Sequence, residues 1–159
     1  MLTKKELAQD VLDRLKCKKI RANSTYAPLE WNNEKDFPND AKQDVLNRPR
    51  CSVCAQGALF LAALEKKNGL TISESIDVVV NVDRLAAYLE AFSVEELKQI
   101  EIFFEAYSSR CEQQYSRYIL NSVGILKNDR LRQIMEHIVR NDGFFPDKYV
   151  LEYPIECEG

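Results

Sequence analysis

Apolar side chains recur at helical intervals over several stretches of the chain, and this periodicity predicts α-helices. The first stretch follows Thr3, which has capping-box spacing with Glu6, and we expect a helix over residues 4–16. Ser93 and Glu96 repeat this spacing before another amphipathic helix. The expected inward face of that helix consists of Leu97, Ile100, Phe104, Tyr107 and Cys111.

Three other stretches also predict helices. Residues 52–67 are apolar almost all round, which is typical of a helix buried on every side. Residues 83–92 predict a short helix, and residues 129–141 predict the last one, with a stop signal after it. Residues 72–82 fit either a strand or a helix, and we favour a helix because one isolated strand has no partner.

These elements predict one mainly α-helical domain over residues 1–159. We expect a compact bundle of about five or six helices around the apolar central helix, with at most a minor sheet. Residues 22–50 contain three prolines and many Asn and Asp residues, so they predict one long irregular loop, which in compact domains is often functional. Residues 147–159 are expected to form an acidic tail.

Composition is typical of a soluble protein made and kept inside the cell. The 159 residues, 45% hydrophobic and 30% charged, suffice for one buried core. The longest nearly apolar run, residues 53–64, is about half the roughly 20 residues of a membrane-spanning helix. The N-terminus lacks the pattern of a secretory signal, and an odd number of cysteines suits a reducing compartment. We therefore expect a cytoplasmic protein without membrane contact.

Charge is divided unevenly along the chain. Residues 1–50 carry 11 basic and 8 acidic groups, whereas residues 51–159 carry 11 and 17. One basic cluster consists of Lys16, Lys18, Lys19 and Arg21. Because the net charge is −3, we do not expect nucleic-acid binding, and the cluster favours an acidic protein partner or a small phosphate-bearing ligand. A solvated helix face, with an acidic recognition surface as the alternative, is predicted for Glu95, Glu96, Glu101 and Glu105.

Candidate reactive groups are few. Cys51 and Cys54 have Cys-x-x-Cys spacing at the start of a predicted helix, which suits redox chemistry or half of a zinc site. No second ligand pair accompanies them, so we expect reduced, structural cysteines and no metal. His137, the only histidine, is the one candidate for acid–base catalysis near neutral pH. Without a phosphate-binding glycine loop or a nucleophile elbow, we expect no cofactor and rank an enzyme third.

One segment carries a family resemblance. Trp31, followed by Cys54-Ala55-Gln56-Gly57-Ala58-Leu59, resembles a Cys-Ala-x-Gly-Ala-Leu segment of small uncharacterised bacterial and phage proteins. That resemblance implies no activity. In size, acidity and lack of catalytic motifs the chain is also similar to phage proteins that inhibit bacterial defence systems.

The leading hypothesis is therefore a non-catalytic interaction protein that binds another macromolecule, and we expect that macromolecule to be a protein. In this hypothesis the chain is a phage-encoded inhibitor of a bacterial defence system. The alternative is a small-ligand or nucleotide-binding protein with a pocket between the long loop and the helix expected over residues 51–67. Trp31 either anchors the loop on the core or contacts the partner. The expected binding residues are Tyr26, Trp31, Arg48, Arg50 and Gln56.

Overall fold

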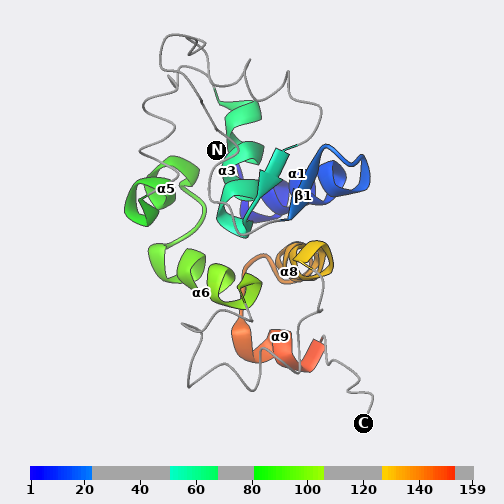
Figure 1. Ribbon diagram of the computed structural model, residues 1–159. Helices are drawn as coiled ribbons and strands as arrows, with labels where there is room; N and C mark the ends of the chain where they lie inside the picture. Colours follow the sequence, from blue (N-terminus) through cyan, green and yellow to red (C-terminus); the bar gives the residue numbers. More distant parts are fainter. Residues whose placement is uncertain (23–50, 68–80, 106–126, 153–159) are drawn as a thin grey trace.

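The computed structural model describes residues 1–22, 51–67, 81–105 and 127–152, and these residues are mainly α-helical (Figure 1). The elements are α1 (Lys4–Lys16), β1 (Ile20–Ala22), β2 (Cys51–Val53), α3 (Ala55–Lys66), α5 (Val82–Leu89), α6 (Val94–Phe104), α8 (Lys127–Asn141) and α9 (Pro146–Glu152). The predicted fold class, a mainly α-helical bundle of about five or six helices with at most a minor sheet, is confirmed for the described part of the chain, which has six helices and one two-stranded sheet.

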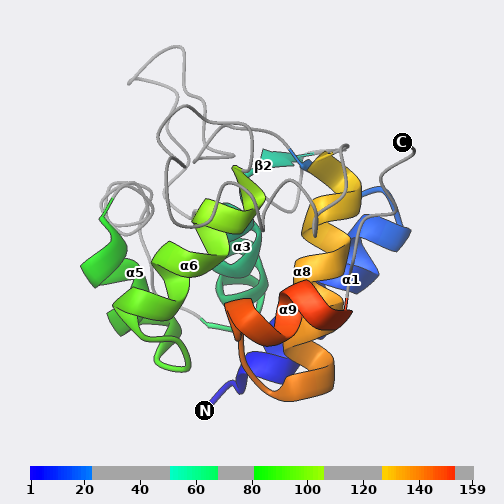
Figure 2. The ribbon, with the colours of Figure 1, turned by 90° about the horizontal axis from the view of Figure 1, so that it is seen from below.

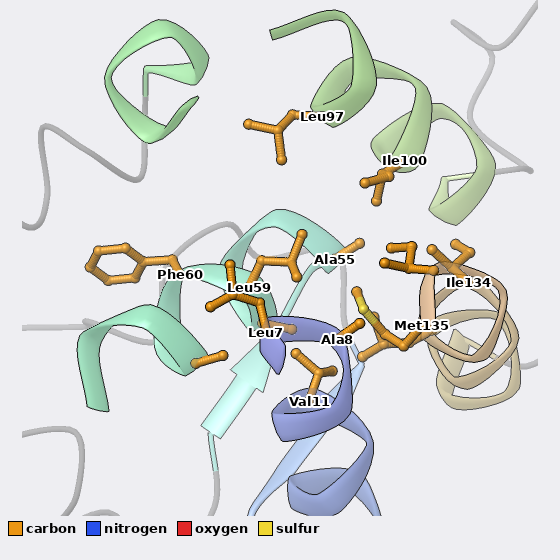
Figure 3. Close-up of a cluster of buried hydrophobic side chains, with 14 of the residues drawn as sticks. Leu7, Ala8, Val11, Ala55, Leu59, Phe60, Leu97, Ile100, Ile134 and Met135 are labelled. Carbon is orange, nitrogen blue, oxygen red and sulfur yellow. The ribbon is translucent and has the colours of Figure 1, made fainter. Parts of the chain in front are cut away.

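Helix α3 lies at the centre of the bundle, as its apolar sequence predicts. It contacts α1 on one side and α5 and α6 on the other (Figures 1 and 2). Every residue of α3 from Ala55 to Leu64 is buried. The close-up shows its side chains Leu59 and Phe60 in one apolar cluster with Leu7 of α1 and Leu97 of α6 (Figure 3). This shared core holds the four helices together.

The start of α1 is set by its capping box. The hydroxyl of Thr3 accepts a hydrogen bond from the Glu6 N–H at 3.1 Å, and the Glu6 carboxylate accepts one from the Thr3 N–H at 2.8 Å. The last turn of α1 leads into β1, whose Ala22 N–H donates to Asn128 at the start of α8. Since Lys4, at the other end of α1, lies near the chain that follows α8, α1 and α8 run side by side in opposite directions (Figure 2).

The minor sheet consists of two short parallel strands. Residues of β1 and β2 pair in the register Ile20 with Cys51 and Ala22 with Val53. The helix expected from residue 52 therefore begins only at Ala55, and that part of the prediction was wrong. The cause is tertiary, because β1 supplies hydrogen-bond partners from about 30 residues earlier in the chain.

The second predicted capping box forms only by half. Ser93 accepts from the Glu96 N–H at 3.1 Å, as expected. The Glu96 carboxylate, however, turns away and binds Lys4 at 2.9 Å and the backbone N–H of Phe144 at 3.0 Å. Its side chain is only 11% exposed. Glu96 therefore joins α6 to the start of α1 and to the chain after α8, and the predicted solvated position was wrong.

Residues expected to begin an acidic tail form helix α9, which lies across α8 (Figure 2). Tyr149 of α9 is fully buried and packs edge-on against Phe103 of α6, with ring centroids 5.3 Å apart. The predictions for residues 23–50, 72–80, 107–111 and 153–159 lie outside the described residues. None of the described helices has the length and apolar content needed to cross a membrane.

Candidate functional site

Four of the five residues expected to bind a partner lie outside the described residues, namely Tyr26, Trp31, Arg48 and Arg50. Gln56 is buried in the first turn of α3, where its side-chain amide donates to the Leu97 carbonyl of α6 at 3.2 Å. Its backbone N–H donates to Glu101 at 3.2 Å. Gln56 thus connects α3 to α6 from within the core.

Cys54 caps the N-terminus of α3 and is fully buried. Its sulfur accepts a hydrogen bond from the Gly57 N–H at 3.3 Å. Burial raises the pKa of the Cys54 thiol well above its ordinary value, and the Glu101 carboxylate raises it further. The thiol is therefore protonated at neutral pH, which opposes both nucleophilic attack and metal binding. Across the described ranges, no group of three or more His, Cys, Asp or Glu side chains is placed to bind a metal ion.

Glu101 is a buried carboxyl on α6, and its predicted solvated position was wrong. It is only 8% exposed. Its Oε2 accepts from the Gln56 N–H, while Oε1 finds no hydrogen-bond partner among the residues that the structure describes. Burial, with a smaller contribution from the Glu105 carboxylate, raises the pKa of Glu101 to about 7, although the Gln56 N–H favours the anion.

The sequence does contain a signal for the burial of Glu101. Glu101 follows Leu97 by four residues and precedes Phe104 by three, so helical spacing places it on the apolar face of α6. A charged residue type led to the opposite prediction.

His137 is fully buried between α8 and α9, and both of its ring nitrogens are hydrogen-bonded. Nε2 accepts from the backbone N–H of Phe145 at 3.2 Å. The proton of the neutral ring is therefore on Nδ1, which donates to Glu152 at 2.9 Å. Burial lowers the pKa of His137, opposed by the nearby Glu152 carboxylate. With both nitrogens engaged, the ring holds α9 against α8 and has no nitrogen left for a substrate.

An open groove lies between α1 and α8 and has a volume of about 550 Å³. We call it the α1–α8 groove. Its lining consists of Gln9, Leu12, Asp13, Leu15, Lys16, Lys18, Ile20, Asn128, Asp129, Arg132 and Glu136. Leu12 and Leu15 are half-buried and pack on the core, so apolar surface lies between charged side chains.

The charges of the groove are paired unequally. Arg132 forms ion pairs with Asp129 at 3.0 Å and Glu136 at 3.9 Å, all on α8. Lys16 and Lys18 are exposed, and neither forms an ion pair within the described part of the chain. Two members of the basic cluster found in the sequence thus reach the groove, whereas its α8 side was not predicted.

Comparison with other proteins gives no guide to the function of this site. No protein-family model, curated protein or solved structure matches the chain. The α1–α8 groove does not include Cys54, Glu101 or His137. Its geometry and charges suit the binding of a ligand or a polypeptide segment.

Proposed function

We propose that this chain is a non-catalytic interaction protein that binds another protein, and that the partner binds in the α1–α8 groove. The observation that carries the proposal is the composition of the groove. Half-buried leucines and exposed charged side chains of both signs line it together. Apolar surface ringed by polar side chains is the usual anatomy of a protein–protein interface.

The buried reactive groups support binding in place of catalysis. The His137 ring uses both nitrogens within the fold, and the Cys54 thiol is inside the core with a raised pKa. General acid–base catalysis needs a group within hydrogen-bond reach of a substrate. The groove provides access to neither residue.

A groove-blocking substitution tests the proposal. Asp13 is exposed at the groove, so Asp13→Trp is expected to fill it without disturbing the core. The matched control is Glu95→Trp, which adds the same side chain to the exposed side of α6. Tagged wild type and both variants are used for affinity purification from bacterial lysate, with quantitative mass spectrometry of the bound proteins and circular dichroism to verify folding.

We expect one partner to be retained by wild type and by Glu95→Trp and to be lost with Asp13→Trp. Equal retention by all three proteins, or no specific partner, would contradict the proposal. The inhibitor role is part of the same proposal and rests on size and acidity. It predicts that the retained partner is a component of a bacterial defence system.

A small phosphate-bearing ligand is the second candidate, and the groove volume favours it specifically. About 550 Å³ lies within the range of small-molecule sites, and Lys16 and Lys18 supply cations. Native mass spectrometry of the purified chain tests this candidate, because a bound ligand adds a discrete mass. The site differs from the one expected beside α3, whose residues from Ala55 to Leu64 are all buried.

A further inference from the structure

We infer that the segment bound in the α1–α8 groove is acidic, with two carboxylates beside Lys16 and Lys18 and an apolar side chain on Leu12 and Leu15. This inference rests on the proposed function and specifies the chemistry of the partner. The charged side chains of the groove differ in whether they already form an ion pair, and this difference indicates the charge of the segment.

The acidic side chains of the groove are already supplied with donors. Asp129 and Glu136 both pair with Arg132, so a basic segment would have to compete with Arg132 for them. Asp13 accepts only from the neutral Gln9 amide at 3.2 Å, so one unpaired carboxylate faces two unpaired lysines among the described residues. An acidic segment meets Lys16 and Lys18 without breaking any ion pair of the described chain. Complementarity of charge therefore favours the acidic segment.

The two lysines are not needed to end α1. Its last carbonyls accept from backbone groups, since the Cys17 N–H donates to the Asp13 carbonyl at 3.0 Å and the Lys19 N–H donates to the Arg14 carbonyl at 3.0 Å. The helix end is thus satisfied by its own main chain. The side chains of Lys16 and Lys18 remain available to a ligand.

Lys18 also has a backbone conformation that suits glycine. Its φ is 59°, in the left-handed region that a residue with a side chain adopts at a cost. This position just after a helix is commonly glycine. Glu90 and Asp142, which follow α5 and α8, have the same left-handed φ, so this conformation belongs to the helix end, and the Lys18 side chain forms no ion pair within the described ranges.

The spacing along α1 defines a suitable probe. Leu12 and Lys16 are one helical turn apart, about 6 Å along the axis. The first probe is a fluorescein-labelled helical peptide of about 15 residues. Leucine and glutamate follow each other in turn along one face of this helix, with one helical turn between each residue and the next. A second peptide has lysine in place of each glutamate, and inorganic pyrophosphate is the third probe. Binding is measured by fluorescence anisotropy, with pyrophosphate added as a competitor.

We expect the acidic peptide to bind wild type and the basic peptide to bind at least tenfold more weakly. The double variant Lys16→Gln/Lys18→Gly is expected to lower affinity for the acidic peptide about tenfold, as two exposed ion pairs predict. Raised salt should weaken binding of wild type and not of the double variant. Lys98→Gln, on the exposed side of α6, is the matched control and should bind as wild type does.

Lys18→Gly alone separates function from folding. It should weaken peptide binding while raising the melting temperature, because glycine relieves the left-handed strain. A merely structural lysine would not show these opposite effects. If Lys18→Gly left peptide binding unchanged, or if the basic peptide bound as tightly as the acidic one, the inference would be overturned.

Other outcomes also overturn it. If pyrophosphate displaced the acidic peptide at a concentration below the dissociation constant of that peptide, the ligand would be a phosphate. If the chain formed a dimer that Lys16→Gln/Lys18→Gly dissociated, the occupant of the groove would be a second copy of the chain. Absence of binding by either peptide would refute an acidic segment. The partner captured with wild type and lost with Asp13→Trp would still support the proposed function, so the two failures are distinguishable.

Discussion

Replacing Glu101 with glutamine is expected to stabilise the protein, and to do so only above the acidic range. The carboxyl is 8% exposed, and its Oε1 makes no hydrogen bond within the described residues. Ionisation of Glu101 places a negative charge in the core, and the Gln56 N–H is the one main-chain donor that binds this carboxylate among the described residues. Glutamine has the same size, and its carbonyl oxygen can accept that bond.

The magnitude follows from the pKa of Glu101. Burial raises it from the ordinary 4.5 to about 7, and this difference corresponds to about 3 kcal/mol of unfolding free energy. The folded chain binds this proton more tightly than the unfolded chain does. The stability that the protonated carboxyl contributes is therefore complete below pH 4.5 and is lost as pH rises through about 7.

Urea unfolding, followed by circular dichroism at intervals from pH 4.5 to 8.5, measures this effect. At pH 8.5 Glu101→Gln should exceed wild type in unfolding free energy by about 2–3 kcal/mol, and at pH 4.5 the two should agree within about 1 kcal/mol. Glu95→Gln removes an exposed carboxyl from the same helix and should show no such trend. A difference between wild type and Glu101→Gln that stays constant over this range would refute the reasoning.

Three further predictions concern other parts of the fold. Because burial lowers the pKa of His137, the unfolded state binds a proton first as pH falls below 6.5, so α9 should loosen on acidification. The protection factor of the Phe145 amide, which is its hydrogen-exchange rate relative to the intrinsic rate at the same pH, should therefore fall from pH 7 to pH 5, and a constant protection factor would contradict this prediction. Thr3→Ala removes the cap of α1 and should lower the unfolding free energy by about 1 kcal/mol in urea, whereas Thr3→Ser should retain most of it. Cys17 is exposed and Cys54 buried, so mass spectrometry after brief alkylation should find Cys17 modified and Cys54 unmodified until urea unfolds the chain; equal labelling would show that the thiol of Cys54 is accessible.

Features that depend on neighbours in sequence were predictable. The capping box of Thr3 and Glu6 forms within four residues, so it determined the start of α1 without help from the rest of the chain. The apolar run of α3 excluded a surface position whatever packed against it, and α3 is the central helix. Ile134 and Ile138 of α8 are buried at the helical spacing that predicted a helix over residues 129–141.

Features that depend on distant partners were not predictable. Cys51–Val53 is a strand only because β1 lies beside it, and Glu96 leaves its own helix end because Lys4 and Phe144 supply donors there. Such pairings cross tens of residues, and local propensity contains no information about them.

One side of the candidate site was predictable from the sequence, and the other side was not. The sequence by itself determined a basic cluster that includes Lys16 and Lys18. Only the tertiary structure placed α8 beside it, with Arg132 already paired to its own helix neighbours. A binding surface is a property of side chains that meet in space, and the antiparallel packing of α1 and α8 is what brings these charges to one groove.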